Sequence, residues 1–129
     1  MRQKIEQVRL LEREAREVSD GVRAAGILRQ AAALAEEVPD LSRAEALVQR
    51  GLAFLPGDPD LLRDLARVRE AAGDLPGVAA VLEEEADRTG SPAEAATRYL
   101  ALARFWEERL GRRDRAVLYY GRASRLAPD

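Results

Sequence analysis

A short turn motif recurs along this chain of 129 residues, and its spacing constrains the fold more than any other feature. Pro39-Asp40-Leu41-Ser42 and Gly73-Asp74-Leu75-Pro76 each combine a helix breaker, an Asp, a Leu and a residue suited to a helix start, and they lie 34 residues apart. A third version, Gly111-Arg112-Arg113-Asp114, follows 38 residues later. Between these turns, apolar residues recur at three- and four-residue steps, which is typical of amphipathic helices. The pattern predicts a series of helical hairpins.

Signals for helix starts and stops divide the chain further. Ser42-Arg43-Ala44-Glu45 has the pattern of a capping box, and the helix that it starts is expected to end near Phe54-Leu55-Pro56-Gly57. Asp58-Pro59 places an N-cap before a proline at the first helical position, where an N–H is not needed. Ser91-Pro92-Ala93-Glu94 combines both devices and predicts a helix from Pro92 to Leu110. That helix is about a turn longer than its counterparts, which accounts for the 38-residue spacing.

The second helix of each expected hairpin carries a spaced signature: a small residue, a large one four later, a small one three later, and a proline five after that. The full copy is Ala116, Tyr120, Ala123 and Pro128. The first copy is Ala44, Val48, Gly51 and Pro56, and the middle copy departs from the pattern with Val78, Leu82, Glu85 and Gly90. These residues resemble the tetratricopeptide repeat, a 34-residue helix–turn–helix unit.

The resemblance implies a tetratricopeptide-repeat protein of bacterial type, or a fragment of one. Its fold would be all-α, with antiparallel helical hairpins stacked as a right-handed superhelix, an α-solenoid. Three repeats are expected within residues 25–129, at about 25–58, 59–92 and 93–129. The alternative that the residues leave open is a bundle of unrelated hairpins.

Residues 1–24 do not follow the repeat. They are expected to form one amphipathic helix, with Ser19-Asp20-Gly21 as the break before the next helix. One interpretation is a capping helix laid against the first repeat, and the other is a coiled-coil or dimerisation arm. The apolar stripe on which both interpretations rest consists of Ile5, Val8, Leu11, Ala15, Val18 and Val22.

The residue inventory argues against catalysis. The chain has no Cys and no His, which removes thiolate nucleophiles, the commonest general base and most zinc ligands. The carboxylate runs Glu36-Glu37, Glu83-Glu84-Glu85 and Glu107-Glu108 lie on expected helices, where adjacent side chains diverge by about 100°. The glycines form no phosphate-binding pattern. We expect no enzyme activity, no cofactor and no metal.

Charge is abundant but balanced. Charged residues are 34% of the chain and leave a net charge of −2, so no overall field attracts nucleic acid or an anionic membrane. The last part differs, because residues 97–129 hold eight Arg against four acids and form a basic end that suits an acidic partner. The first residues lack the apolar core of a signal peptide, and no run of 18 apolar residues occurs, so a cytoplasmic location is expected.

The resemblance also implies a binding groove, lined by the first helix of each repeat, for a peptide or helix of another protein. Its arginines would read carboxylates of the partner while Phe105 supplies an apolar contact, unless the arginines pair within their own helices instead. The residues expected to line this groove are Arg29, Glu36, Asp60, Arg63, Arg67, Glu70, Arg98 and Phe105.

The expected function is therefore a non-catalytic scaffold or adaptor for protein–protein interaction, with an acidic peptide among the suitable partners. The alternative is an oligomerisation or assembly module, or a fragment of a longer solenoid, that uses the N-terminal helix and an open C-terminal edge. That edge is expected to leave Leu118, Tyr119 and Leu126 uncovered, while Tyr120 packs as the core ring of its repeat.

Overall fold

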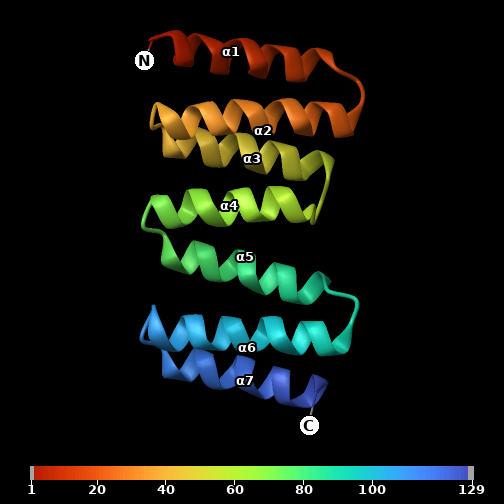
Figure 1. The fold of residues 1–129 in the computed structure, drawn as a ribbon, viewed down its shortest axis with the longest axis vertical. Coiled ribbons are helices and arrows are strands. Elements are labelled where there is room, and N and C mark those ends of the chain that lie inside the picture. The colour runs from red at the N-terminus through yellow and green to blue at the C-terminus, as the bar shows by residue number, and fades with distance from the viewer. Residues whose placement is uncertain (1, 128–129) are drawn as a thin grey trace. The chain divides into compact units, whose positions relative to one another are not determined.

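In the computed structural model of the protein, which describes residues 2–127, the regular elements are all α-helices (Figure 1). The all-α prediction is confirmed. The chain divides between Ala72 and Gly73 into an N-terminal unit and a C-terminal unit, and the division falls within the expected middle repeat. The N-terminal unit contains α1 (Arg2–Glu17), α2 (Gly21–Glu37), α3 (Leu41–Phe54) and α4 (Pro59–Ala71). The C-terminal unit contains α5 (Leu75–Arg88), α6 (Pro92–Glu108) and α7 (Arg113–Leu126).

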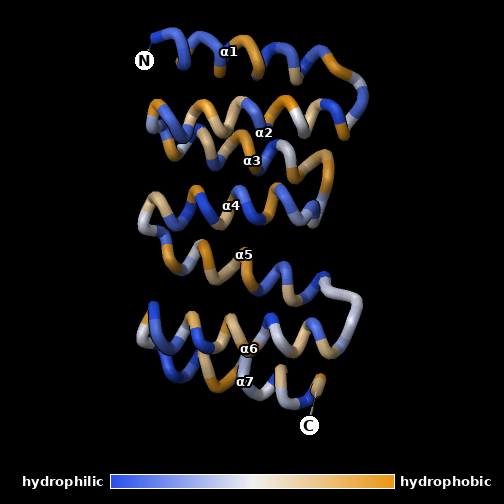
Figure 2. Tube along the Cα trace, viewed as in Figure 1, coloured by the Kyte–Doolittle hydropathy of each residue, from blue (hydrophilic) through white to orange (hydrophobic). Residues whose placement is uncertain are grey.

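Within each unit, helices that follow one another in the chain pack together. In the N-terminal unit α1 packs on α2, α2 on α3 and α3 on α4, and consecutive helices run in opposite directions (Figure 1). In the C-terminal unit α5 packs on α6 and α6 on α7. Apolar and polar residues are interspersed along every helix (Figure 2), as in amphipathic helices that turn one side toward a core. Stacking of these hairpins as a right-handed superhelix stays a prediction.

At most helix starts, a nearby side chain accepts a hydrogen bond from a backbone amide, as the sequence indicates. Asp58 accepts from the amide of Leu61 at 3.0 Å, and Pro59 follows it at the first helical position. Ser91 caps α6 in the same way, before Pro92. The predicted capping box at Ser42 is wrong, because Asp40 is the N-cap of α3 and accepts from the amide of Arg43 at 3.1 Å. Asp40 lies one residue before the helix, and Ser42 is already inside it.

The predicted single helix of residues 1–24 also needs correction. The break at Ser19-Asp20-Gly21 is confirmed, since the Asp20 carboxylate accepts from the Val22 amide and starts α2 at Gly21. Val18 is therefore outside α1, and Val22 is on α2 with 66% of its surface exposed. Val8 and Ala15 are the buried residues of α1. Similarly, α6 ends at Glu108 rather than at Leu110.

Small side chains let the helices of the N-terminal unit approach closely. Gly51 of α3 faces α4, where an added Cβ would lie only 3.0 Å from Leu61 Cδ2. Leu61 is fully buried, so it has little room to move. Five alanines of α2 are buried as well: Ala24, Ala25, Ala31, Ala32 and Ala35.

The core of the C-terminal unit contains two stacked tyrosine rings. Tyr99 of α6 and Tyr119 of α7 have ring centroids 6.4 Å apart and nearly parallel planes. The Tyr119 hydroxyl donates to Glu83 of α5 at 2.9 Å, and the Tyr99 hydroxyl donates to Asp87. Tyr119 is 3% exposed, so the prediction of an uncovered Tyr119 is wrong. Tyr120, predicted as the core ring, is only partly buried, and its signature partner Pro128 lies outside the described residues.

Two glycines offer a matched test of this packing. Gly26 lies inside α2 with open space around the position of a Cβ, so Gly26→Ala should raise the free energy of unfolding by about 0.5–1 kcal/mol through helix propensity. Gly51→Ala gains the same propensity but forces a methyl against Leu61, so it should lower the free energy of unfolding by about 1 kcal/mol. Urea denaturation measures both, and equal gains from the two variants would contradict the close approach.

Candidate partner-binding surface

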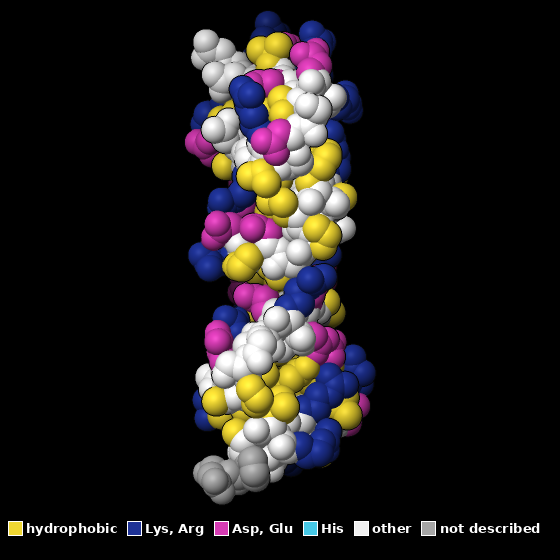
Figure 3. All heavy atoms as spheres, turned by 90° about the vertical axis from the view of Figure 1, so that its right-hand side faces the viewer, with side chains coloured by type: hydrophobic (Ala, Val, Ile, Leu, Met, Phe, Trp, Pro, Cys, Tyr) yellow, Lys and Arg dark blue, Asp and Glu magenta, His cyan; other side chains and the backbone are white. Residues whose placement is uncertain are grey.

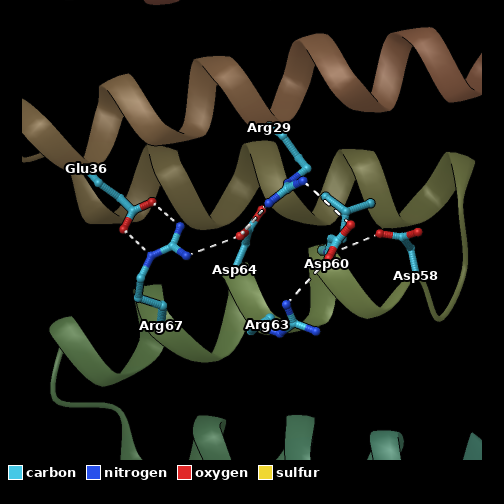
Figure 4. Close-up of polar contacts among 8 residues, drawn as sticks. Arg29, Glu36, Asp58, Asp60, Arg63, Asp64 and Arg67 are labelled. Atoms are coloured by element: carbon cyan, nitrogen blue, oxygen red, sulfur yellow. Dashed lines mark hydrogen bonds and ion pairs between the residues drawn. The ribbon is translucent and has the colours of Figure 1, made fainter.

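Two helices of the N-terminal unit bring charged side chains to one surface, which we call the α2–α4 face. Helix α2 contributes Arg29 and Glu36, and α4 contributes residues spaced three or four apart along one side (Figure 4). The α4 members are Asp60, Arg63, Asp64 and Arg67. Five of these six residues belong to the predicted groove, and Asp64 is the addition.

Asp64 is the centre of the α2–α4 face. It is only 5% exposed, and a buried carboxylate requires ionic or hydrogen-bonding partners. Arg29 reaches it from α2, donating from Nε at 2.6 Å and from Nη2 at 3.2 Å. Arg67, one turn along α4, donates from Nη1 at 3.2 Å. One buried carboxylate thus holds two arginines that come from different helices.

Arg67 has a second carboxylate partner on α2. Its Nε and Nη2 donate to the two oxygens of Glu36 at 3.0 and 2.8 Å, which is the bidentate geometry of strong arginine–carboxylate pairs. This hydrogen bonding raises the pKa of Arg67 above its usual value, and the hydrogen bonds that Arg29 donates to Asp64 do the same for the pKa of Arg29. Both arginines are therefore firmly positive and fixed in direction.

Arg63 differs from these two arginines. Its side chain is 73% exposed, and its ion pair with Asp60 spans 3.6 Å on the surface of α4. Exposed pairs of this kind contribute about 0–1 kcal/mol, so the pair restrains Arg63 weakly. Asp60 also lies 3.9 Å from Arg29. Glu70, the last α4 residue of the predicted groove, is exposed near the end of the helix.

The remaining predicted groove residues, Arg98 and Phe105, are on α6 in the C-terminal unit and have partners there. Arg98 forms ion pairs with Glu85 and Glu94, each at 3.4 Å. Phe105 is partly buried against the core of the C-terminal unit, and the guanidinium of Arg109 lies 5.4 Å from its ring centroid.

The sequence left open whether the arginines serve a partner or pair within their own helix. The pairs Arg63–Asp60 and Arg67–Asp64 are within α4, but the closest contacts join α4 to α2. Sequence reasoning missed Asp64 as the residue that joins them. Its signal was present, because Asp64 lies three residues after Leu61 and four before Val68, at a position of the apolar stripe. A carboxylate in such a stripe needs arginines nearby.

The α2–α4 face presents charged groups of both signs. Its three arginines and three carboxylates balance in charge and offer both hydrogen-bond donors and acceptors. Among residues 2–127, no group of three or more His, Cys, Asp or Glu is arranged to hold a metal ion. The same residues include no helix long and apolar enough to cross a membrane.

No protein-family model matches the chain, and no curated protein matches it either.

The burial of the Asp64 carboxylate leads to a prediction about stability. Asp64→Asn replaces an acceptor with an amide whose donors face the donors of Arg29 and Arg67, so we expect a loss of about 1–2 kcal/mol in the free energy of unfolding. Asp60→Asn is the matched control, because Asp60 is 57% exposed and should cost at most about 0.5 kcal/mol. Urea denaturation compares the two, and similar costs would show that Asp64 does not organise this surface.

Proposed function

We propose that this protein is a non-catalytic scaffold that holds a peptide or helix of a partner protein on the α2–α4 face. The observation that carries the proposal is the fixed, accessible pair Arg29 and Arg67, whose side chains are 44% and 54% exposed although Asp64 orients both. Binding to a surface that is already ordered loses less side-chain entropy. A guanidinium has five N–H groups, so hydrogen-bonding capacity is left for a partner.

The repeat pattern supports the same proposal. Helices α3 and α5 begin after capping aspartates 34 residues apart, Asp40 and Asp74, as a 34-residue repeat requires. Helices α4 and α6 each begin with a capped proline, Pro59 and Pro92. In tetratricopeptide repeats the first helix of each repeat lines the binding groove, and α2 and α4 are the first helices of the first two repeats in this interpretation.

Arg63 is the residue that we assign to a partner carboxylate. Arg29 and Arg67 already have close carboxylates, whereas Arg63 has the weaker 3.6 Å pair and the greater exposure. Because the face is balanced in charge, the partner segment is expected to carry both acidic and basic groups, with an acidic group opposite Arg63.

A charge reversal with a matched control tests the proposal. Peptides selected from a display library against the whole chain should lose about tenfold or more in affinity for the Arg63→Glu variant, measured by fluorescence anisotropy. Arg9→Glu is the control, since Arg9 on α1 is 62% exposed and pairs with Glu6 three residues away, as Arg63 does with Asp60. Peptides that bind both variants as tightly as the parent protein would remove the α2–α4 face from the proposal.

A second candidate function is self-association through α1, and one observation favours it. Leu10 is 58% exposed beside a hollow of about 550 Å³ between α1 and α2. Helix α1 carries five basic and four acidic residues, so its charges nearly balance and the helix as a whole does not repel a second copy. The hollow is lined by Gln7, Leu10, Leu11, Gln30, Ala33, Leu34 and Glu37.

Sedimentation over a concentration series tests this second candidate. The parent protein should dimerise as its concentration rises, and Leu10→Glu should shift it to monomer by placing a charge in the apolar contact. A parent protein that stays monomeric throughout the series would eliminate self-association through α1.

A further inference from the structure

The outward side of α7, in the C-terminal unit, combines exposed aliphatic residues with arginines. Ala116, Tyr119 and Ala123 are buried on the inner side of the helix. On the outer side, Val117 is 66% exposed and Leu118 is 45% exposed. Aliphatic side chains this exposed on adjacent positions leave a small apolar area in contact with water.

Arginines surround this apolar pair. Arg113 lies one turn before Val117, and Arg122 lies one turn after Leu118. Figure 3 shows Lys and Arg side chains gathered beside hydrophobic ones in the lower part of the picture, where the C-terminal unit is drawn. We call the outward side of α7 the α7 face, and its residues are Arg113, Arg115, Val117, Leu118, Arg122 and Arg125.

Carboxylates compensate the positive charge of the α7 face only in part. Arg113 is 89% exposed, and its nearest carboxylate, Glu107, lies at 3.9 Å. Within residues 2–127, no ion pair joins Arg115 or Arg125 to a carboxylate. Asp114 is the acidic residue of α7, and Arg112 already holds it at 3.0 Å and 3.1 Å. That hydrogen bonding lowers the pKa of Asp114 to about 2, so the carboxylate remains ionised and paired.

Several arginines of the α7 face are oriented by neighbouring groups. The guanidinium of Arg115 lies 4.9 Å from the ring centroid of Trp106, within the range of a cation–π contact. The side chain of Arg125 extends back along α7 toward Gly121. Its Nη1 lies 3.6 Å from the position that a Cβ at Gly121 would take. Arg122 is held by Glu83 at 3.2 Å and lies over the rings of Tyr99 and Tyr119.

These features restrict what the face binds. A symmetric contact between two copies through α7 would oppose arginine to arginine, which costs free energy. Single-stranded nucleic acid needs open aromatic rings for stacking, but guanidiniums already lie over Trp106 and Phe105. A membrane-binding helix inserts a broad apolar side, and the broad side of α7 is buried in the unit's own core.

We propose that the α7 face binds an acidic amphipathic helix of a partner protein. The partner's apolar residues contact Val117 and Leu118, and its carboxylates contact Arg113, Arg115 and Arg125. An arginine-rimmed apolar centre has the usual composition of a protein interface. The proposal concerns a different unit from the α2–α4 face and does not depend on it.

Binding of designed peptides to the whole chain tests the proposal. The probe is a labelled helical peptide of about 20 residues with Leu one turn apart between Glu residues, and its control has Gln in place of every Glu. The Glu peptide should bind about tenfold more tightly than the Gln peptide and weaken as salt is added. Arg113→Glu/Arg125→Glu should lose about tenfold in affinity for the Glu peptide, by anisotropy.

Two further variants separate the apolar contact from a general charge effect. Val117→Ser/Leu118→Ser should lose about tenfold in affinity for the Glu peptide at low and at high salt, because the double variant removes apolar contact without changing charge. Arg88→Glu is the control, since Arg88 is a half-exposed arginine on α5 of the same unit, and it should bind like the parent protein. Circular dichroism confirms that each variant is folded.

The outcomes that overturn the proposal are distinct. Equal binding of the Glu and Gln peptides, or unchanged binding by Arg113→Glu/Arg125→Glu, excludes an acidic partner at this face. Tighter binding of a single-stranded oligonucleotide or of anionic phospholipid vesicles, abolished by the same variant, assigns the face to nucleic acid or to membrane instead. A dimer of the parent protein that this variant disrupts assigns it to a second copy.

Discussion

The buried carboxylate of Asp64 is the interaction on which the polar surface of the N-terminal unit depends. An ionised side chain with 5% exposure is stable only with close partners, and its partners come from both α2 and α4. Replacing such a cluster with well-packed apolar residues is often neutral or stabilising, so net stability does not explain it. The cluster instead orients the two arginines. Arg29 and Arg67 stay half exposed, yet each guanidinium has a defined orientation.

In the C-terminal unit, carboxylates also accept hydrogen bonds from neighbouring helices, but the donors are tyrosines. Glu83 and Asp87 of α5 accept hydrogen bonds from Tyr119 of α7 and Tyr99 of α6, so two carboxylates of one helix fix two neighbouring helices. Burial and hydrogen bonding to these carboxylates raise the pKa of both tyrosines, which remain neutral donors at physiological pH. In both units, polar contacts between helices set positions that the abundant alanines, with small and similar surfaces, specify poorly.

The sequence predicted those features that depend on neighbouring residues. Helix starts at Asp58 and Ser91 and the break at Asp20 are local, because a side chain caps amides two or three positions away. The errors arose where tertiary contacts decide. Tyr119 and Tyr120 are adjacent, and only the position of α5 and α6 determines which ring is buried. Likewise, the sequence cannot show that Arg29 reaches Asp64, 35 residues away.

The two polar surfaces show why the overall charge of a chain says little about its partners. The chain has a net charge of −2, yet it contains a face that is balanced in charge, on α2 and α4, and a basic face on α7. Screening limits the reach of exposed charges to about 8–10 Å at physiological salt, so a partner responds to the charges of the face that it meets. The carboxylates of the α2–α4 face are internal partners of its arginines, and this lowers the gain from an acidic ligand there. Among residues 2–127, Arg115 and Arg125 of α7 have no such carboxylate partner, so a carboxylate arriving from another protein interacts with them without displacing an existing ion pair.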